Sequence, residues 1–343
     1  MNRILWTSYS FMAKNMKKTY HLCLSSENEV LFRCHEDFIR GINCLCLLAR
    51  RTGVPLLAYA FMSNHVHLCV RTDSPEKFMR AFRFAYTRYF NSKYGRSGRL
   101  CEEKFFKLEI EGLYHLLTAI AYILRNPMHH GVTGTPFAYP YSSIRALFRR
   151  DFGWDDNVQY LPRKYAYHHI PDHWSLPEDI EMDASGKILP QFAIDVADVE
   201  HQFATARTFL YYMNRLSGEK WEKEQTLDAI QCPPISLKDI EKGIVYQDLR
   251  TMLNNEHGRS NYNAVTDLQL CHEVDNVVLP SLLKNGSPFH IAAIHYKSVK
   301  SLSVYTLTNE DKIRLGHYLS CKYHVSAAQI RRCLVLPYAV ALH

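Results

Sequence analysis

The apolar positions in the first 130 residues follow two different spacings, and each spacing predicts one kind of element. Alternating or continuous apolar runs predict strands at 19–26, at 54–72 (as a strand pair or one bent strand) and at 100–112. Apolar residues at helical spacing predict helices at 35–53, 74–95 and 114–127. We expect Pro127 to end the third helix, because proline disrupts helical hydrogen bonding. This mixture of strands and helices indicates a compact α+β sandwich with antiparallel pairing.

The pattern changes beyond residue 150, which suggests a different organisation for the rest of the chain. Residues 151–190 are rich in proline, aspartate and aromatic residues, and we interpret them as a connector. Helical spacing then returns at 195–217, 235–256, 263–285 and 309–337. We therefore expect a domain at 1–150 and a mostly helical C-terminal region at 191–343. The segment 309–337 is compatible with a helix-turn-helix and equally with a plain helical hairpin.

The charge of the chain is distributed unevenly. The net charge is +7; residues 1–150 contain 22 Lys and Arg against 10 Asp and Glu (+12), which leaves −5 for the remainder. A basic first half indicates a polyanionic partner, without choosing between nucleic acid and another anionic surface. Ten cysteines without a CxxC pair favour reduced thiols in the cytoplasm. We expect no membrane span and no secretory signal.

Two histidines interrupt the apolar run AFMSNHVHLCV at 60–70. In a strand, His65 and His67 project from the same face, and two converging imidazoles can bind one divalent metal ion. The alternative is a pair of partly buried, hydrogen-bonded histidines without a metal.

The helix at 114–127 carries a second group of polar residues. Tyr122 and Asn126 are four residues apart, so they lie on one helical face. With the histidines, the Asn126 oxygen would bind Mg²⁺ or Mn²⁺, and Tyr122 could attack the phosphorus of a polarised phosphate. The alternative for Tyr122 is a tyrosine at the edge of the core.

Five segments in order give a resemblance to a known family. They are MSNHVHL, AYTRYFNSKYGRSGRL, KFFKLEI, AYILRNPMHHGV and YPYSSIRALF. Across residues 17–148 the chain resembles the REP-associated tyrosine transposases, which are one-tyrosine HUH (IS200-like) transposases. It departs from the usual pattern at Met128, His129 and His130 and in the segment CEEKFF.

The resemblance implies a ferredoxin-like antiparallel sheet with helices on one face and the histidines on a central strand. It implies that His65, His67 and Asn126 bind the metal ion, whereas Tyr122 is the catalytic nucleophile. The enzyme would cut single-stranded DNA beside a palindromic hairpin, forming a 5′-phosphotyrosine link and a free 3′-OH. The resemblance does not cover the region beyond residue 150.

Basic and aromatic residues alternate along 74–99, as expected for a surface that binds phosphates and stacks on unpaired bases. The alternative is that the aromatics form core and the basic residues a solvated face. The candidate DNA-binding residues are Arg83, Arg88, Lys93, Arg96, Arg99 and Arg125.

These features predict a metal-dependent transposase that acts on single-stranded or hairpin DNA. One alternative is a domesticated DNA-binding or regulatory protein whose catalysis is lost or incidental. A metal hydrolase of another type is disfavoured, because no acidic ligands follow the histidines near Cys69. The oligomeric state stays open, with a homodimer as one option, as does whether Tyr122 serves its own metal site.

Overall fold

The computed structural model describes residues 17–26, 28–130, 132–133, 135–154, 158–214, 265–282 and 303–337. The predicted helix at 235–256 lies outside the described residues.

A four-stranded antiparallel sheet forms the centre of the molecule, as the sequence predicted. Its strands are β1 (Thr19–Ser25), β2 (Leu56–Phe61), β3 (His65–Arg71) and β4 (Phe106–Ile110). The order is β2-β3-β1-β4, which places β3 and β1 in the middle. The region 54–72 is therefore a strand pair, and the order is that of a ferredoxin-like sheet.

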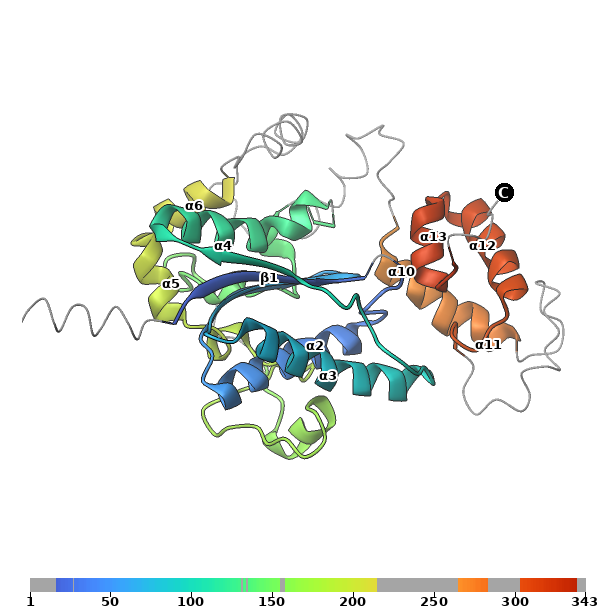
Figure 1. Ribbon diagram of the computed structural model, residues 1–343, viewed down its shortest axis with the longest axis horizontal. Coiled ribbons are helices and arrows are strands. Elements are labelled where there is room, and N and C mark those ends of the chain that lie inside the picture. The colour runs from blue at the N-terminus through green and yellow to red at the C-terminus, as the bar shows by residue number, and fades with distance from the viewer. Residues whose placement is uncertain are drawn as a thin grey trace, which may run out of the picture.

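Two helices cover one face of this sheet. They are α2 (His35–Thr52) and α3 (Pro75–Tyr94), and both lie below the strands in Figure 1. Each ends at a left-handed glycine, Gly53 with φ 60° and Gly95 with φ 62°, as their sequence positions suggested. Leu22, Leu24, Val66 and Leu68 are fully or almost fully buried apolar residues of the two central strands.

The helix α4 (Gly112–His129) covers the opposite face, so the expectation of helices on one face only was wrong. The predicted end at Pro127 was also wrong, because α4 continues for two more residues. Proline lacks a backbone N–H but keeps its carbonyl, so the carbonyl groups in the last turn of α4 can still accept hydrogen bonds. Asn126 O accepts from His130 N (3.0 Å), and Pro127 O accepts from Val132 N (2.8 Å).

Residues 132–214 continue the main core around this sheet. The predicted helix at 195–217 is two helices, α5 (Val196–Phe203) and α6 (Ala206–Asn214), because Ala204 adopts a positive φ of 64° between them. The expected connector packs on α2: Asn43 Nδ2 donates to His169 O (2.9 Å) and Gly186 O (2.7 Å).

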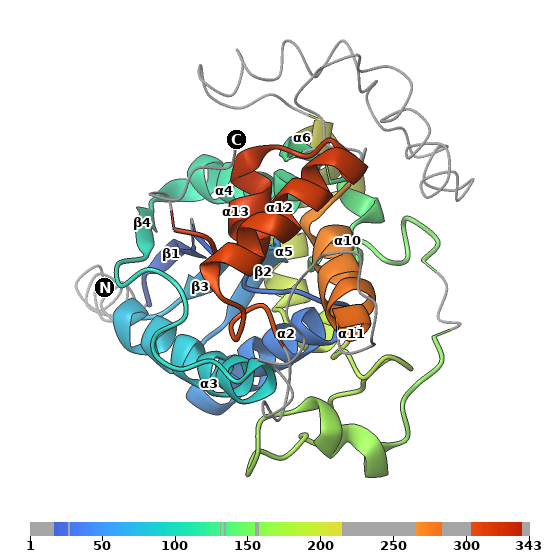
Figure 2. The same ribbon diagram turned by 90° about the vertical axis from the view of Figure 1, so that its right-hand side faces the viewer.

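The C-terminal helices form a second core beside the sheet (Figure 2). These are α10 (Asp267–His272), a π-helical turn (Glu273–Val278) and α11 (Leu279–Leu282) in continuous sequence, followed by α12 (Asn309–Tyr323) and α13 (Ala327–Leu334). Val30, from the segment before α2, belongs to this second core. The C-terminal region is thus helical, as predicted, and it is packed on the N-terminal part.

The two helices and the turn predicted at 309–337 are present, but two polar side chains of the second helix, α13, are engaged within the protein. Gln329 is buried and donates to Val265 O (2.8 Å), and Arg332 pairs with Asp267. In the part of the chain that the structure describes, no helix combines the length and apolar character that crossing a membrane requires.

Candidate active site

The strand β3 places His65 and His67 together on the face of the sheet that α4 covers. In the pairing with β1, His65 lies opposite Ser25 and His67 lies opposite Cys23. Because the side chains of a strand alternate, Val66 points to the other face, where it is fully buried. The expected convergence of the two imidazoles is present, with ring centroids 5.0 Å apart.

The helix α4 brings Tyr122 and Asn126 to these histidines. Asn126 Oδ1 lies 2.9 Å from His65 Nε2. One turn earlier, the Tyr122 ring packs edge-on to His67 with a centroid distance of 5.4 Å. The four residues predicted from the sequence therefore meet at one place, and Tyr122 and Asn126 each approach a different histidine.

The electrostatics of the site keep its imidazoles neutral. Burial lowers the pKa of His67 well below its usual value, and the neighbouring His65 lowers it further. Burial also lowers the pKa of His65. A neutral imidazole retains one nitrogen lone pair, which is the form that binds a metal ion.

The residues fit a divalent cation. Adjacent oxygen or nitrogen ligands around a six-coordinate Mg²⁺ at ~2.1 Å lie about 3 Å apart, and Asn126 Oδ1 is 2.9 Å from His65 Nε2. The amide of Asn126 is fully buried, and its Nδ2 has no hydrogen-bond partner within the described residues. Within these same residues no group of three His, Cys, Asp or Glu could hold a metal ion, so a site here needs the amide oxygen of Asn126.

Further histidines surround this group, and the sequence analysis did not select them. His21 Nε2 lies 2.9 Å from His67 Nδ1, and the His130 ring is 5.1 Å from the His65 ring. Burial lowers the pKa of both His21 and His130 to about 4. The alternation in TYHLCLS placed His21 on one strand face, but spacing alone could not show that β1 pairs with β3.

Cys23 also lies at the site. Its Sγ is 4.0 Å from His67 Nε2, and burial raises the pKa of the thiol to about 12. Cys23 therefore remains a neutral thiol at physiological pH and is a poor ligand for Mg²⁺ or Mn²⁺, which prefer oxygen and imidazole.

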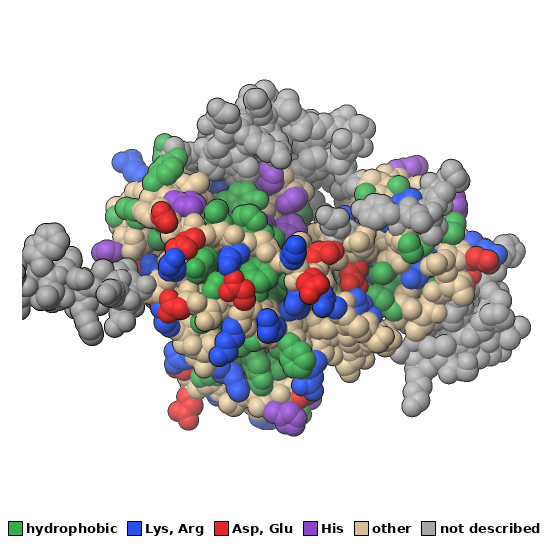
Figure 3. Space-filling view, in the orientation of Figure 1, with side chains coloured by type: hydrophobic (Ala, Val, Ile, Leu, Met, Phe, Trp, Pro, Cys, Tyr) green, Lys and Arg blue, Asp and Glu red, His purple; other side chains and the backbone are tan. Residues whose placement is uncertain are grey.

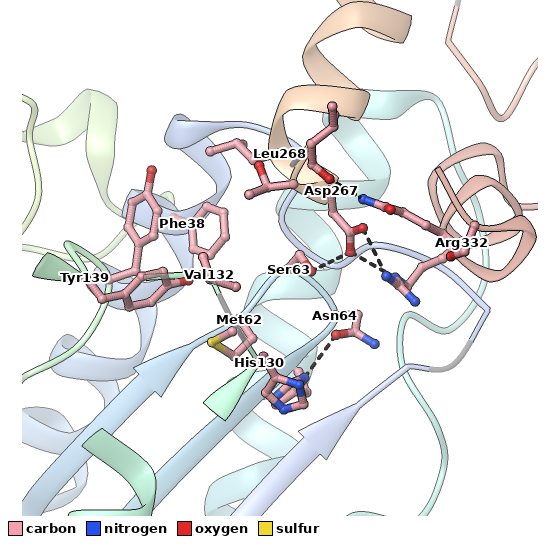
Figure 4. A pocket seen from close by; sticks show the side chains of 16 residues that line it. Phe38, Met62, Ser63, Asn64, His130, Val132, Tyr139, Asp267, Leu268 and Arg332 are labelled. Atoms are coloured by element: carbon pink, nitrogen blue, oxygen red, sulfur yellow. Dashed lines mark hydrogen bonds and ion pairs between the residues drawn. The ribbon is translucent and has the colours of Figure 1, made fainter. Parts of the chain in front are cut away.

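A cavity of about 280 Å³ opens beside His65, between the sheet and the C-terminal helices. Asn64 Oδ1 lies 3.0 Å from His65 Nδ1, where the amide oxygen can accept a hydrogen bond, and Ser63 Oγ donates to Asp267 Oδ2 over 2.6 Å. Arg332 forms two further contacts with the Asp267 carboxylate, of 2.9 and 3.0 Å (Figure 4). The turn before β3 is thus attached to α10 and, through it, to α13.

The candidate DNA-binding residues do not gather around Tyr122. Arg83, Arg88 and Lys93 lie on α3, which covers the other face of the sheet. Arg88 and Arg99 are exposed, and Arg83 donates to the backbone oxygens of Glu102 and Glu103, both over 2.9 Å. In Figure 3 the basic side chains of the visible face are interspersed with acidic ones instead of forming one continuous patch.

Three of these candidates are engaged inside the protein. Lys93 Nζ lies 2.8 Å from the buried carboxylate of Asp37, and Arg96 pairs with Glu29 over 2.7 Å. Arg125 is only 3% exposed, and burial lowers its pKa to about 10, so it stays charged at neutral pH. Contact of these three side chains with DNA would require them to leave these environments.

Two comparisons with known proteins bear on this site. Residues 14–124 match the family model "Transposase IS200 like", a range that includes His65, His67 and Tyr122 and ends two residues before Asn126. A solved structure titled "Structure of the REP associates tyrosine transposase bound to a REP hairpin" is similar at 15% identity and a TM-score of 0.34, covering 40% of this chain and 81% of that one. A search of curated proteins gave no match.

The family match and the fold agree on the same segment. The matched range contains the complete four-stranded sheet, and transposases are enzymes that cleave and join DNA strands. Residues 14–124 of this chain are therefore similar to the IS200-like transposases.

Proposed function

We propose that this transposase cuts single-stranded DNA beside a hairpin, with Tyr122 as nucleophile and His65, His67 and Asn126 as ligands of Mg²⁺ or Mn²⁺. The observation that carries this proposal is the meeting of all four side chains on one face of the sheet, through the 2.9 Å contact of His65 with Asn126 and the 5.4 Å ring contact of His67 with Tyr122.

The chemistry follows from the residue types. When bound, the metal ion would polarise a phosphate oxygen and so make the phosphorus a better electrophile. Tyr122 Oη attacks the phosphorus, the bond from phosphorus to the 3′ oxygen breaks, and the proton that the tyrosine releases is balanced by the one that the 3′ oxygen takes up. The DNA then carries a free 3′-OH, while the 5′ phosphate is joined to Tyr122. This link conserves the phosphodiester bond energy for rejoining.

The arrangement supports use of Tyr122 in its own chain, because Tyr122 contacts His67, and His67 contacts His65, within one molecule. A homodimer is therefore not required to complete the site.

Binding of the DNA strand is proposed to involve Arg88 and Arg99, which are exposed, and Arg83, which is half-buried. The free thiols of the cysteines in the described ranges support a cytoplasmic location.

The decisive experiment is capture of a covalent adduct between the protein and DNA. Hairpin oligonucleotides with randomised single-stranded flanks are incubated with the full chain and Mn²⁺, and adducts are resolved by denaturing electrophoresis. Tyr122→Phe keeps the packing of the ring but removes the attacking oxygen, so we expect no adduct from this variant.

Tyr114→Phe is the matched control, because Tyr114 lies two turns earlier on the same helix and is 58% exposed. It should form the adduct normally. An undiminished adduct with Tyr122→Phe would assign the nucleophile to another tyrosine. Absence of any adduct from the unmodified protein, with hairpin binding retained, would favour a DNA-binding protein that has lost catalysis.

A further inference from the structure

His21 and His67 form a buried contact between two imidazoles. His21 Nε2 lies 2.9 Å from His67 Nδ1, and the ring centroids are 5.1 Å apart. A short contact between the two nitrogen atoms at this centroid distance means that the rings meet edge to edge and share one hydrogen bond. Both side chains are buried, at 6% and 7% exposure, so water does not compete for this contact.

One proton lies between the two rings, and its location decides which lone pairs remain. If His67 Nδ1–H donates to His21 Nε2, then His67 Nε2 keeps its lone pair. If His21 donates instead, His67 must carry its proton on Nε2, and that nitrogen cannot bind a cation. The tautomer of a ligand histidine is set by the hydrogen bond of its other nitrogen.

We propose that His21 is a positioning residue that accepts the Nδ1–H of His67 and thereby holds His67 Nε2 ready for the metal ion. This inference rests on the proposed function, because it takes His67 as a metal ligand. His21 itself does not bind the ion, since its Nε2 is directed at His67. Its own proton is then on Nδ1.

The surroundings of His21 agree with a role at the site. Its ring lies on the face covered by α4, where it is 5.7 Å from the Tyr122 ring and 5.4 Å from the Phe106 ring, both edge-on. These aromatic contacts fix the plane of the His21 ring. The same histidine thus orients one ligand and packs beside the nucleophile.

Two amide variants separate this role from simple packing. In glutamine the side-chain oxygen is as many bonds from Cα as Nε2 is in histidine, so His21→Gln can still accept from His67. His21→Asn presents its oxygen one bond earlier and cannot reach. His21→Leu fills the space without any acceptor. His201→Leu, at an exposed histidine on α5, is the distant control.

The measurement is Mn²⁺ binding to the full chain, followed by the electron paramagnetic resonance signal of free Mn²⁺. Loss of an outer partner of a ligand histidine typically weakens metal binding about 10–100-fold. We expect that loss for His21→Leu and His21→Asn, a change below about threefold for His21→Gln, and none for His201→Leu. Hairpin binding should stay unchanged in all four, which shows that they are folded.

The unloaded protein gives a second readout. The ¹⁵N shifts of selectively labelled histidines report which ring nitrogen carries the proton, and the His67 signals are assigned by their loss in His67→Gln. We expect His67 protonated on Nδ1 in the unmodified protein and in His21→Gln. In His21→Asn this preference should be lost.

The outcomes separate this inference from the proposed function. Equal Mn²⁺ affinity in the unmodified protein and in His67→Ala would mean that the metal site itself is wrong. Strong binding that His67→Ala abolishes but His21→Asn and His21→Leu leave intact would overturn only the role of His21. If His21→Leu does not fold, the difference between the Gln and Asn variants decides.

Discussion

At the scale of single residues, Asn126 is the most unusual member of the site. It is fully buried, its oxygen points at His65, and its Nδ2 has no partner within the described residues. A buried amide group without a partner costs free energy. Under the proposed function the oxygen of this amide binds the metal ion, which would account for a polar side chain at this position.

Asn126→Asp should therefore destabilise the metal-free protein and strengthen metal binding. The variant buries a negative charge in the absence of metal, but a carboxylate is a better ligand for Mn²⁺ than an amide. Thermal unfolding with and without Mn²⁺ measures both effects: we expect a lower Tm without metal and a larger rise on adding Mn²⁺ than in the unmodified protein. An equal rise in both proteins would argue against Asn126 as a ligand.

His65→Ala and His67→Ala should each abolish metal-dependent cleavage and leave hairpin binding largely intact. Binding should come mainly from contacts with phosphates and bases away from the proposed metal ion. Adduct formation and hairpin affinity are measured on the same preparations. Loss of both adduct formation and hairpin binding, in a variant whose unfolding transition is unchanged, would contradict this separation of cleavage from binding.

The spacing of the sequence was sufficient for the four central residues and insufficient for their neighbours. His65 with His67, and Tyr122 with Asn126, are each related within one element, so strand and helix periodicity place them correctly. His21 and His130 reach the site through strand pairing and through the end of α4, and neither relation is encoded in local spacing. The placement of two residues relative to each other was predictable where one element carries both.

At the scale of elements, the N-terminus of α2 shows why a basic residue on α3 need not bind DNA. Asp37 is completely buried and accepts hydrogen bonds from Tyr89 (2.9 Å), Tyr94 (2.7 Å) and Lys93 (2.8 Å), as well as from the backbone of Arg33 (2.9 Å). The two helices are therefore joined around one carboxylate.

Lys93→Met should destabilise the protein without weakening DNA binding per folded molecule. Removing one partner of a buried carboxylate costs about 1–3 kcal/mol. Urea unfolding measures the stability, and Lys77→Met, at an exposed lysine of α3, is the control that should change it little. A clear loss of hairpin affinity at unchanged stability would instead return Lys93 to the DNA-binding surface.

Arg88→Ala should have the opposite effect. Arg88 is exposed and its guanidinium lies 5.9 Å from the centre of the exposed Phe84 ring, so it is available to a phosphate. We expect weaker hairpin binding with a smaller dependence on salt and an unchanged free energy of unfolding. An unchanged salt dependence would show that α3 does not contact the DNA.

Element boundaries were predicted well where a cap residue marks them and poorly elsewhere. Gly53 and Gly95 end α2 and α3 in the left-handed conformation that glycine favours. The helix end at Pro127 and the single helix at 195–217 were predicted wrongly. Pro127 is tolerated in the last turn of α4, and Ala204 adopts a positive φ that its residue type does not suggest.

At the scale of the whole molecule, a buried arginine joins the C-terminal helices to the segment that precedes α2. Arg33 is fully buried, forms two 2.9 Å contacts with Asp275 in the π-helical turn, and donates to Cys333 O over 2.8 Å. These partners are 242 and 300 residues away in sequence. The division of charge between the two halves of the chain gave no indication of this pairing.

Asp275→Ala should weaken this attachment strongly. It leaves the Arg33 guanidinium buried without its counter-charge, and breaking a buried pair in this way typically costs about 3–5 kcal/mol. Thermal unfolding and limited proteolysis measure the effect, which we expect as a lower Tm and faster cleavage between the two parts.

Lys322→Ala is the control for that experiment, because Lys322 is 43% exposed and pairs with Glu273 over 2.6 Å on the same group of helices. An exposed pair contributes at most about 1 kcal/mol. Equal effects of the two substitutions would show that Arg33 does not depend on Asp275.

The contact of Ser63 with Asp267 has a consequence for the time at which the site is completed. The strands and α4 are all encoded before residue 130, so they can pair as soon as that part of the chain has left the ribosome. The turn before His65 obtains its last partner 204 residues later. During synthesis, the histidines are therefore in place early, and the wall of the cavity beside them closes only when the end of the chain arrives.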